Sequence, residues 1–205
     1  IQCSFEKGKG RGPETSKLLK VADNLTLGFH RLAINGLDDI SNQPIEVEGI
    51  HLICNGEIYN YKELYQLMPG FAPKTNSDCE VIIHLYMRYG IEQTLHMLDG
   101  VFAFVLLDTR LTLDENGKTR SKKMFIARDP YGVRPMYMLS PKYILDKQTD
   151  VPQSQYISTT YAFASELKSI ISFKNILHHA EITQFSPGTY SSFVEEECRL
   201  SLIHI

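Results

Sequence analysis

Val101-Phe-Ala-Phe-Val-Leu-Leu-Asp108 is the stretch that decides the fold. Apolar residues run through it almost without interruption, whereas a strand with one face in water would alternate apolar and polar residues. We therefore expect a strand that is covered on both faces and lies at the centre of a sheet.

Segments of strand and helix character surround this central strand. Strand patterns occur at 25–34, 49–54, 123–128, 134–139 and 161–164, and helical patterns form one block at 61–68, 78–89 and 91–98. Polar segments predict a hairpin loop at 111–121 and an exposed loop at 142–158. Grouped helices between strands, rather than strict alternation, predict an α+β fold with mostly antiparallel sheets in one domain, 1–205.

Composition excludes several classes of function. The 205 residues are 43% apolar, and 21 Lys and Arg face 24 Asp and Glu, for a formal charge of -3. No global positive field exists to hold a nucleic-acid backbone, so no nucleic-acid partner is expected. No apolar run is long enough to cross a bilayer, and no export signal is present. The sequence predicts a soluble, cytoplasmic chain without a membrane partner.

Four cysteines, at positions 3, 54, 79 and 198, show neither a C-x-x-C pair nor the spacing of a disulfide framework. Cys54 and Cys79 lie in apolar or helical runs, which predicts buried reduced thiols. No two histidines stand four residues apart beside a carboxylate, so no metal site is expected.

Asn55-Gly56-Glu57 follows directly on the apolar run that ends at Cys54. Asn-Gly is the commonest dipeptide of tight turns, which is the structural interpretation. The functional alternative is an oxyanion hole, because the Asn55 amide and the Gly56 N–H can both point at one developing negative oxygen.

Two charged residues also have a structural and a functional interpretation. Arg31 lies in a strand pattern, where it is either an edge or ion-pairing residue or a bidentate ligand for a substrate carboxylate. Asp78 begins a helical pattern, where it or Ser77 can cap the first turn. A carboxylate there can instead receive a ligand's ammonium group.

Seven motifs, taken together and in order, point to one family. The motifs are Arg11-Gly-Pro-Glu14, Gly28-Phe-His-Arg-Leu-Ala33, Cys54-Asn-Gly-Glu-Ile-Tyr-Asn60, Ser77-Asp-Cys-Glu80, Leu98-Asp-Gly-Val-Phe-Ala-Phe104, Arg128-Asp-Pro-Tyr-Gly-Val-Arg-Pro135 and Ala164-Ser-Glu-Leu-Lys168. With them the chain resembles the glutamine-hydrolysing domain of glutamine-dependent asparagine synthetase, a class II (N-terminal-nucleophile) glutamine amidotransferase. The resemblance runs from about Gly10 to Tyr190 and implies an αββα sandwich of two antiparallel sheets flanked by helices.

The resemblance assigns a role to each candidate residue. It implies that Arg31 binds the carboxylate of glutamine and Asp78 its α-ammonium group. Asn55 and Gly56 would form the oxyanion hole, and Glu57 would lie beside the bound glutamine.

The sequence departs from the family in two ways. The family's nucleophile is the first residue of the mature chain, a cysteine in Cys-Gly-Ile, and Cys3 lies too near Arg11 to take that position. The phosphate-binding loop of the ATP-dependent synthetase domain is also absent. The resemblance therefore implies glutamine and a separate synthetase domain as partners, with ATP and Mg²⁺ needed only by that domain and no cofactor in the glutamine-hydrolysing one. A homodimer is compatible with it.

Three interpretations follow for the chain. The first is the ammonia-producing part of an asparagine synthetase-type enzyme, inactive without its nucleophile. The second is a pseudoenzyme that keeps the glutamine pocket as a binding or regulatory module. The third is another class II amidotransferase, such as the one that feeds purine synthesis, because residues 128–135 resemble that group as well.

Overall fold

The computed structural model describes residues 1–110, 112–113, 119–120, 122–141, 160–177, 180–194 and 203–204. The chain divides into two compact units. The larger comprises 9–134 and 186–205, and the smaller comprises 1–8 and 135–185.

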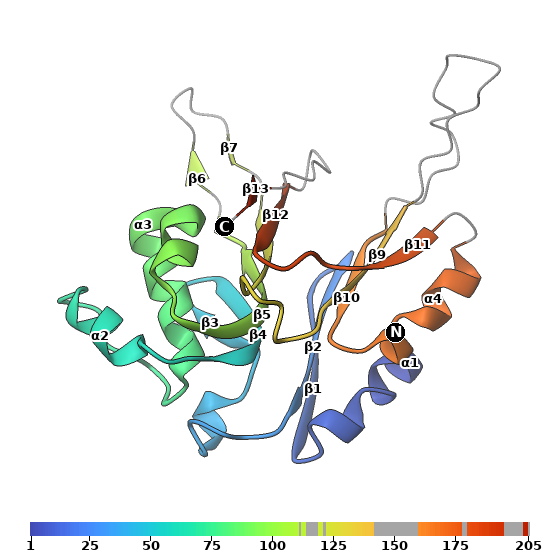
Figure 1. Cartoon of the computed structure of the whole chain (residues 1–205), viewed down its shortest axis with the longest axis horizontal. Helices are drawn as coiled ribbons and strands as arrows, with labels where there is room; N and C mark the ends of the chain where they lie inside the picture. Colours follow the sequence, from blue (N-terminus) through green and yellow to red (C-terminus); the bar gives the residue numbers. More distant parts are fainter. Residues whose placement is uncertain are drawn as a thin grey trace. The chain divides into compact units, whose positions relative to one another are not determined.

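A six-stranded antiparallel sheet forms the centre of the larger unit, in the order β13-β12-β8-β5-β4-β3 (Figure 1). β5 pairs with β4 along its whole length and with β8 on its other edge. Phe102 to Asp108 are buried, so the prediction of a central strand is confirmed. The strands are β3 (Ile45–Val47), β4 (Ile50–Ile58), β5 (Gly100–Asp108), β8 (Lys123–Arg128), β12 (Thr189–Val194) and β13 (Ile203–His204).

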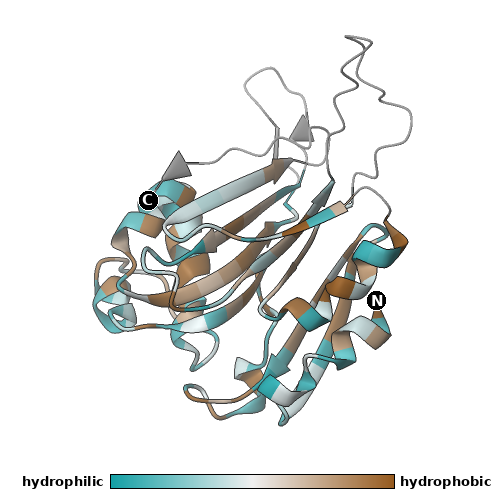
Figure 2. Ribbon diagram, turned by 45° about the vertical axis from the view of Figure 1, so that its right-hand side comes forward, coloured by the Kyte–Doolittle hydropathy of each residue, from teal (hydrophilic) through white to brown (hydrophobic). Residues whose placement is uncertain are grey.

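Helix α3 (Val81–Met97) supplies much of the apolar core beside this sheet. Val81, Ile82 and Leu85 are fully buried and belong to one hydrophobic cluster with Leu52 and Phe104 of the sheet. Helix α2 (Tyr61–Gln66) joins the same cluster. Figure 1 shows α2 and α3 together on one side of β3, β4 and β5, and Figure 2 shows apolar residues along the strands.

The start and the break of α3 follow local signals in the sequence. Gly90 has a φ of 76°, which is non-helical, so the predicted division between 78–89 and 91–98 is confirmed. A 3₁₀ turn, η3 (Asp78–Glu80), precedes α3, and the Ser77 hydroxyl accepts a hydrogen bond from the Cys79 N–H at 3.3 Å. Ser77 is therefore the cap, and the alternative that Asp78 caps this turn is wrong.

Two short antiparallel ladders complete the larger unit. β1 (Thr15–Ala22) pairs with β2 (Leu25–Arg31), so the strand predicted at 25–34 ends at Arg31. β6 (Thr112–Leu113) pairs with β7 (Thr119–Arg120), which confirms a hairpin within 111–121. The tip of that hairpin and the loop predicted at 142–158 lie outside the described residues.

The smaller unit has its own sheet and core. Its strands run in the order β10-β9-β11 and are β9 (Tyr137–Pro141), β10 (Ala162–Ala164) and β11 (Ala180–Gln184). Leu139, Ile170 and Ala180 form its buried core. The helices are α1 (Gln2–Glu6), α4 (Ile171–Ile176) and the 3₁₀ turn η4 (Leu167–Ser169).

The predicted α+β fold with antiparallel sheets is confirmed. The larger unit also contains the 3₁₀ turns η1 (Lys9–Arg11) and η2 (Asp39–Ser41). Within the described residues, no helix is long and apolar enough to span a membrane.

Candidate functional site

Asn55, Gly56 and Glu57 lie inside β4, opposite Ala103, Phe102 and Val101 of β5. The interpretation of Asn55-Gly56 as a tight turn is therefore wrong: pairing with β5 outweighs the local turn preference of the dipeptide.

Gly56 has a packing reason of its own. A Cβ added there would lie 2.2 Å from the Val101 carbonyl oxygen and 2.7 Å from the Phe102 Cα. Only glycine allows the two strands to approach this closely at that point. The oxyanion hole proposed for Asn55 and Gly56 stays a prediction.

Asp78 lies beside the end of β4. Its side chain is buried, and its Oδ2 accepts a hydrogen bond from the Ile58 N–H at 2.7 Å. The Cys79 Sγ lies 3.9 Å from both Asp78 Oδ2 and the Gly56 carbonyl oxygen. Within the described part of the chain, both contacts of the carboxylate are made by Oδ2. Binding of a ligand's ammonium group by Asp78 stays a prediction.

Arg31, the last residue of β2, is buried and points into the loop that follows it. Its Nη1 donates to the Asp38 carbonyl oxygen at 2.9 Å and to the Asn42 Oδ1 at 2.6 Å, and its Nη2 donates to the Gly36 carbonyl oxygen. These three acceptors are neutral oxygen atoms. A carboxylate placed here would be a stronger acceptor for the guanidinium than any of them.

A hydrogen-bond network connects the loop around Arg31 with the segment before Asp78. The Asp38 carboxylate accepts from the Asn76 side-chain amide, and the Ser41 hydroxyl accepts from the Asn76 N–H at 3.1 Å. Hydrogen bonds from the Ser41 side chain first, and then from Asn76, hold the pKa of Asp38 below its ordinary value. The structure thus brings together the segments that carry the two charged candidate residues.

Glu57 contacts a residue that sequence reasoning did not pair with it. Its Oε1 lies 3.7 Å from the Nη2 of Arg134, and both side chains are half-buried. The loop of Arg134 is held by the fully buried Asp129 carboxylate, which accepts from the backbone N–H groups of Tyr131, Val133 and Arg134 at 3.0 to 3.2 Å. The motif at 128–135 was the available signal, but it did not reveal this partner.

Two cysteines near the candidate residues are poor nucleophiles. Cys54 and Cys79 are buried and reduced, as predicted. A hydrogen bond with Cys54 and burial raise the pKa of the Cys79 thiol well above its ordinary value, so the thiolate is disfavoured. Cys3, in α1 of the smaller unit, is exposed, and Cys198 lies outside the described residues.

Comparison with known proteins decides the family. The sequence profile of the glutamine amidotransferase domain matches residues 1–200. The chain belongs to this family. The resemblance indicated by the seven motifs is confirmed.

Similar sequences occur in asparagine synthetases described as glutamine-hydrolysing. The protein of Mesocricetus auratus is 38% identical over 198 residues, which cover 93% of this chain and 30% of that protein. The protein of Gallus gallus is 46% identical over 144 residues, covering 67% and 23%, respectively. The chain thus spans less than a third of the length of these relatives.

A solved structure, described as the allosteric regulatory enzyme of purine biosynthesis, aligns with a TM-score of 0.49 and 25% identity. The alignment covers 72% of this chain and 27% of that one.

Proposed function

We propose that this amidotransferase domain binds glutamine and serves as the glutamine-hydrolysing part of an asparagine synthetase-type enzyme. The family and the relatives described as glutamine-hydrolysing asparagine synthetases support the proposal. The observation that carries it is the network joining the Arg31 loop to the segment before Asp78. It places a buried cation and a buried carboxylate on connected segments, as recognition of an α-amino acid requires.

Binding would exchange neutral partners for charged ones. The carboxylate of glutamine would accept from the Arg31 guanidinium in competition with the carbonyl oxygens of Gly36 and Asp38. Its α-ammonium group would donate to Asp78 Oδ1, while the Ile58 N–H holds Oδ2 in place. Charge-assisted bonds are the stronger kind, so they favour the ligand over the internal contacts.

Hydrolysis would follow from attack of a thiolate on the side-chain amide carbon of glutamine. The negative oxygen that develops would be stabilised by the Asn55 amide and the Gly56 N–H. Collapse of the tetrahedral adduct breaks the C–N bond, and ammonia leaves with the proton taken from the nucleophile. Water then hydrolyses the glutamyl thioester to glutamate and free thiol. The ammonia would pass to aspartate activated in an ATP- and Mg²⁺-dependent synthetase domain.

The attacking thiolate is proposed to belong to a residue outside the 205-residue chain. Cys54 and Cys79 are buried, and the pKa of Cys79 is raised. These features also favour a second candidate function, a glutamine-binding module that does not hydrolyse its ligand. A glutaminase assay of the full natural protein separates the two. Release of glutamate that is lost when the proposed N-terminal cysteine is changed to alanine supports the hydrolysing function, and no release supports the binding module.

Calorimetric titration of the 205-residue chain with L-glutamine tests the proposed binding. Arg31→Lys keeps the charge but cannot make two parallel hydrogen bonds, so we expect about tenfold weaker binding or more. Arg110→Lys is the matched control, because Arg110 forms a two-bond pair with Asp108 instead. No binding by the wild-type chain, or equal affinity of the Arg31→Lys and wild-type chains, would refute the assignment.

A further inference from the structure

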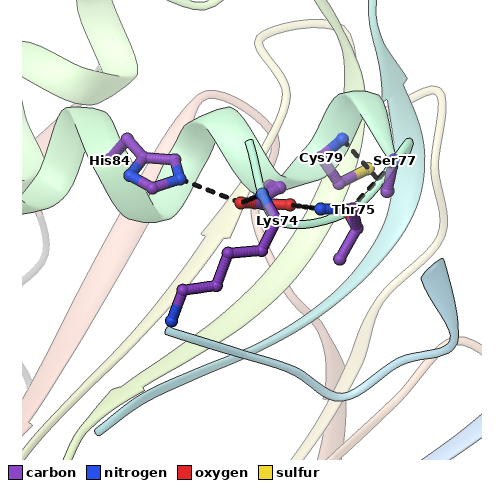
Figure 3. Close-up of polar contacts among 6 residues, drawn as sticks. Lys74, Thr75, Ser77, Cys79 and His84 are labelled. Atoms are coloured by element: carbon purple, nitrogen blue, oxygen red, sulfur yellow. Dashed lines mark hydrogen bonds and ion pairs between the residues drawn. The ribbon is translucent and has the colours of Figure 1, made fainter. Parts of the chain in front are cut away.

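Glu80 is a fully buried carboxylate that holds the loop before Asp78. Its Oε1 accepts from the Lys74 N–H at 2.7 Å and contacts His84 Nε2 at 2.9 Å, and its Oε2 accepts from the Thr75 N–H at 2.6 Å. Figure 3 shows the His84 ring on α3 pointing toward the segment that carries Lys74 and Thr75. One side chain thus fixes two consecutive backbone groups.

Glu80 keeps its charge in spite of its burial. Burial alone would raise its pKa, but hydrogen bonds from His84, Thr75 and Lys74 together lower the pKa below the ordinary value. An ionised carboxylate accepts stronger hydrogen bonds than a neutral one. The loop is therefore held by charge-assisted bonds.

His84 is placed so that it can orient Glu80. Its ring contacts those of Tyr65 and Phe71, with centroids 5.6 and 5.4 Å away in edge-on arrangements. Its Nδ1 and the Tyr65 hydroxyl are buried without a hydrogen-bond partner in the described part of the chain. The contact with His84 therefore sets the orientation of the carboxylate that holds the loop.

Two further hydrogen bonds, each from a backbone N–H group to a side-chain hydroxyl, connect the Thr75 segment with Asp78. The Thr75 hydroxyl accepts from the Ser77 N–H at 3.1 Å, and the Ser77 hydroxyl accepts from the Cys79 N–H at 3.3 Å. Asp78 lies between these two residues, and its own carboxylate accepts from the Ile58 N–H. A shift of the Thr75 segment would therefore move the backbone that carries the Asp78 carboxylate.

We propose that Glu80, oriented by His84, is a positioning residue that sets the affinity for glutamine by holding the Asp78 carboxylate in place. The inference rests on the proposed function, because Asp78 is there the partner of the ligand's ammonium group. Glu80 itself contacts the loop, and no contact between Glu80 and the ligand is proposed.

Amide hydrogen exchange of the ligand-free 205-residue chain tests the structural part. Glu80→Gln keeps the volume but leaves one acceptor oxygen for the Lys74 and Thr75 N–H groups. We expect faster exchange at the Ile58 N–H than in the wild type, with unchanged exchange at the Leu52 N–H of the same strand. Unchanged exchange at Ile58 would overturn the proposal whether or not the chain binds glutamine.

Calorimetric titration with L-glutamine tests the consequence. We expect Glu80→Gln to weaken binding about tenfold, which is within the range of coupling between connected residues. Thr94→Val is the control, since Thr94 is fully buried on the same helix and donates to the Gly90 carbonyl oxygen at 2.7 Å. It should lower stability without changing the affinity for glutamine.

A second variant keeps the test decisive if Glu80→Gln does not fold. His84→Phe preserves the ring packing but removes the contact to Glu80, and it should change Ile58 exchange and glutamine affinity in the same direction by less. If Thr94→Val weakens binding as much as the Glu80 and His84 variants do, the effect is general destabilisation and the proposal fails. Absence of binding by the wild type would refute the proposed function and, with it, the effect of Glu80 on affinity. The exchange result would still decide whether Glu80 holds the Asp78 segment in place, since that measurement needs no ligand.

Discussion

The guanidinium of Arg134 lies 3.7 Å from the carboxylate of Glu57, so the loop after β8 reaches the residue that follows Gly56 in β4. About a third of each side chain is exposed. Exposed ion pairs of this kind contribute about 0 to 1 kcal/mol to stability. The pair is therefore better suited to fixing the direction of Glu57 than to stabilising the fold.

Glu57→Gln separates these two effects. We expect the free energy of unfolding to change by less than about 1 kcal/mol, because water screens the lost pair. The affinity for glutamine should fall, because Glu57 is predicted to lie beside the ligand. Urea unfolding and calorimetric titration measure the two quantities. A large loss of stability with unchanged affinity would show that Glu57 is structural.

Gly56→Ala should destabilise the larger unit. The added Cβ would meet backbone atoms of Val101 and Phe102 at 2.2 and 2.7 Å, and backbone cannot rotate away as a side chain can. Overpacking of this kind costs about 1 to 3 kcal/mol. Gly10→Ala is the control, since a Cβ there meets nothing within 4 Å. Equal urea midpoints for the two variants would contradict the close approach of β4 and β5.

Sequence patterns predicted elements whose residues themselves carry the signal. The continuous apolar run of β5 indicated a central strand, and the non-helical Gly90 divides α3 where the pattern broke. β1 escaped prediction because it has no clear alternation and its first three residues are exposed. The end of β4 was misread because Asn-Gly is a turn signal in isolation, whereas nine paired residues of β5 hold it extended.

For the candidate site, the sequence likewise indicated individual residues but not the contacts between them. Motifs indicated Arg31 and Asp78 as charged candidates, but not the Asn76 contacts that join their segments. The sequence could not reveal that Glu80 holds the loop before Asp78, because two of its three partners are backbone N–H groups of an irregular loop. No periodicity in side chains reports such contacts.

The lowered pKa of Glu80 predicts a loss of stability in acid. Burial opposes this shift, but hydrogen bonds from His84, Thr75 and Lys74 outweigh it. Because the folded pKa lies below the unfolded value of about 4.3, the contribution is complete above that value and is lost as pH falls through the folded pKa. Urea unfolding from neutral pH to about pH 3 should show a shrinking difference between wild type and Glu80→Gln. A difference that stays constant over this range would show that Glu80 is not ionised in the folded protein.

The last prediction concerns the reactivity of the cysteine thiols and the glutaminase activity of the chain. Cys3 is exposed, whereas Cys79 is buried with a pKa raised by its hydrogen bond with Cys54 and by burial. Alkylation follows the accessible thiolate, so iodoacetamide at neutral pH should modify Cys3 much faster than Cys79, as peptide mapping by mass spectrometry can measure. Because Cys54 and Cys79 are buried, we expect the 205-residue chain to bind glutamine without releasing glutamate. Loss of the attacking group costs several orders of magnitude in kcat, about 10⁶-fold in a well-studied hydrolase. Glutamate release that iodoacetamide abolishes in step with modification of one of the four cysteines, at positions 3, 54, 79 and 198, would overturn this expectation and assign the nucleophile to that residue.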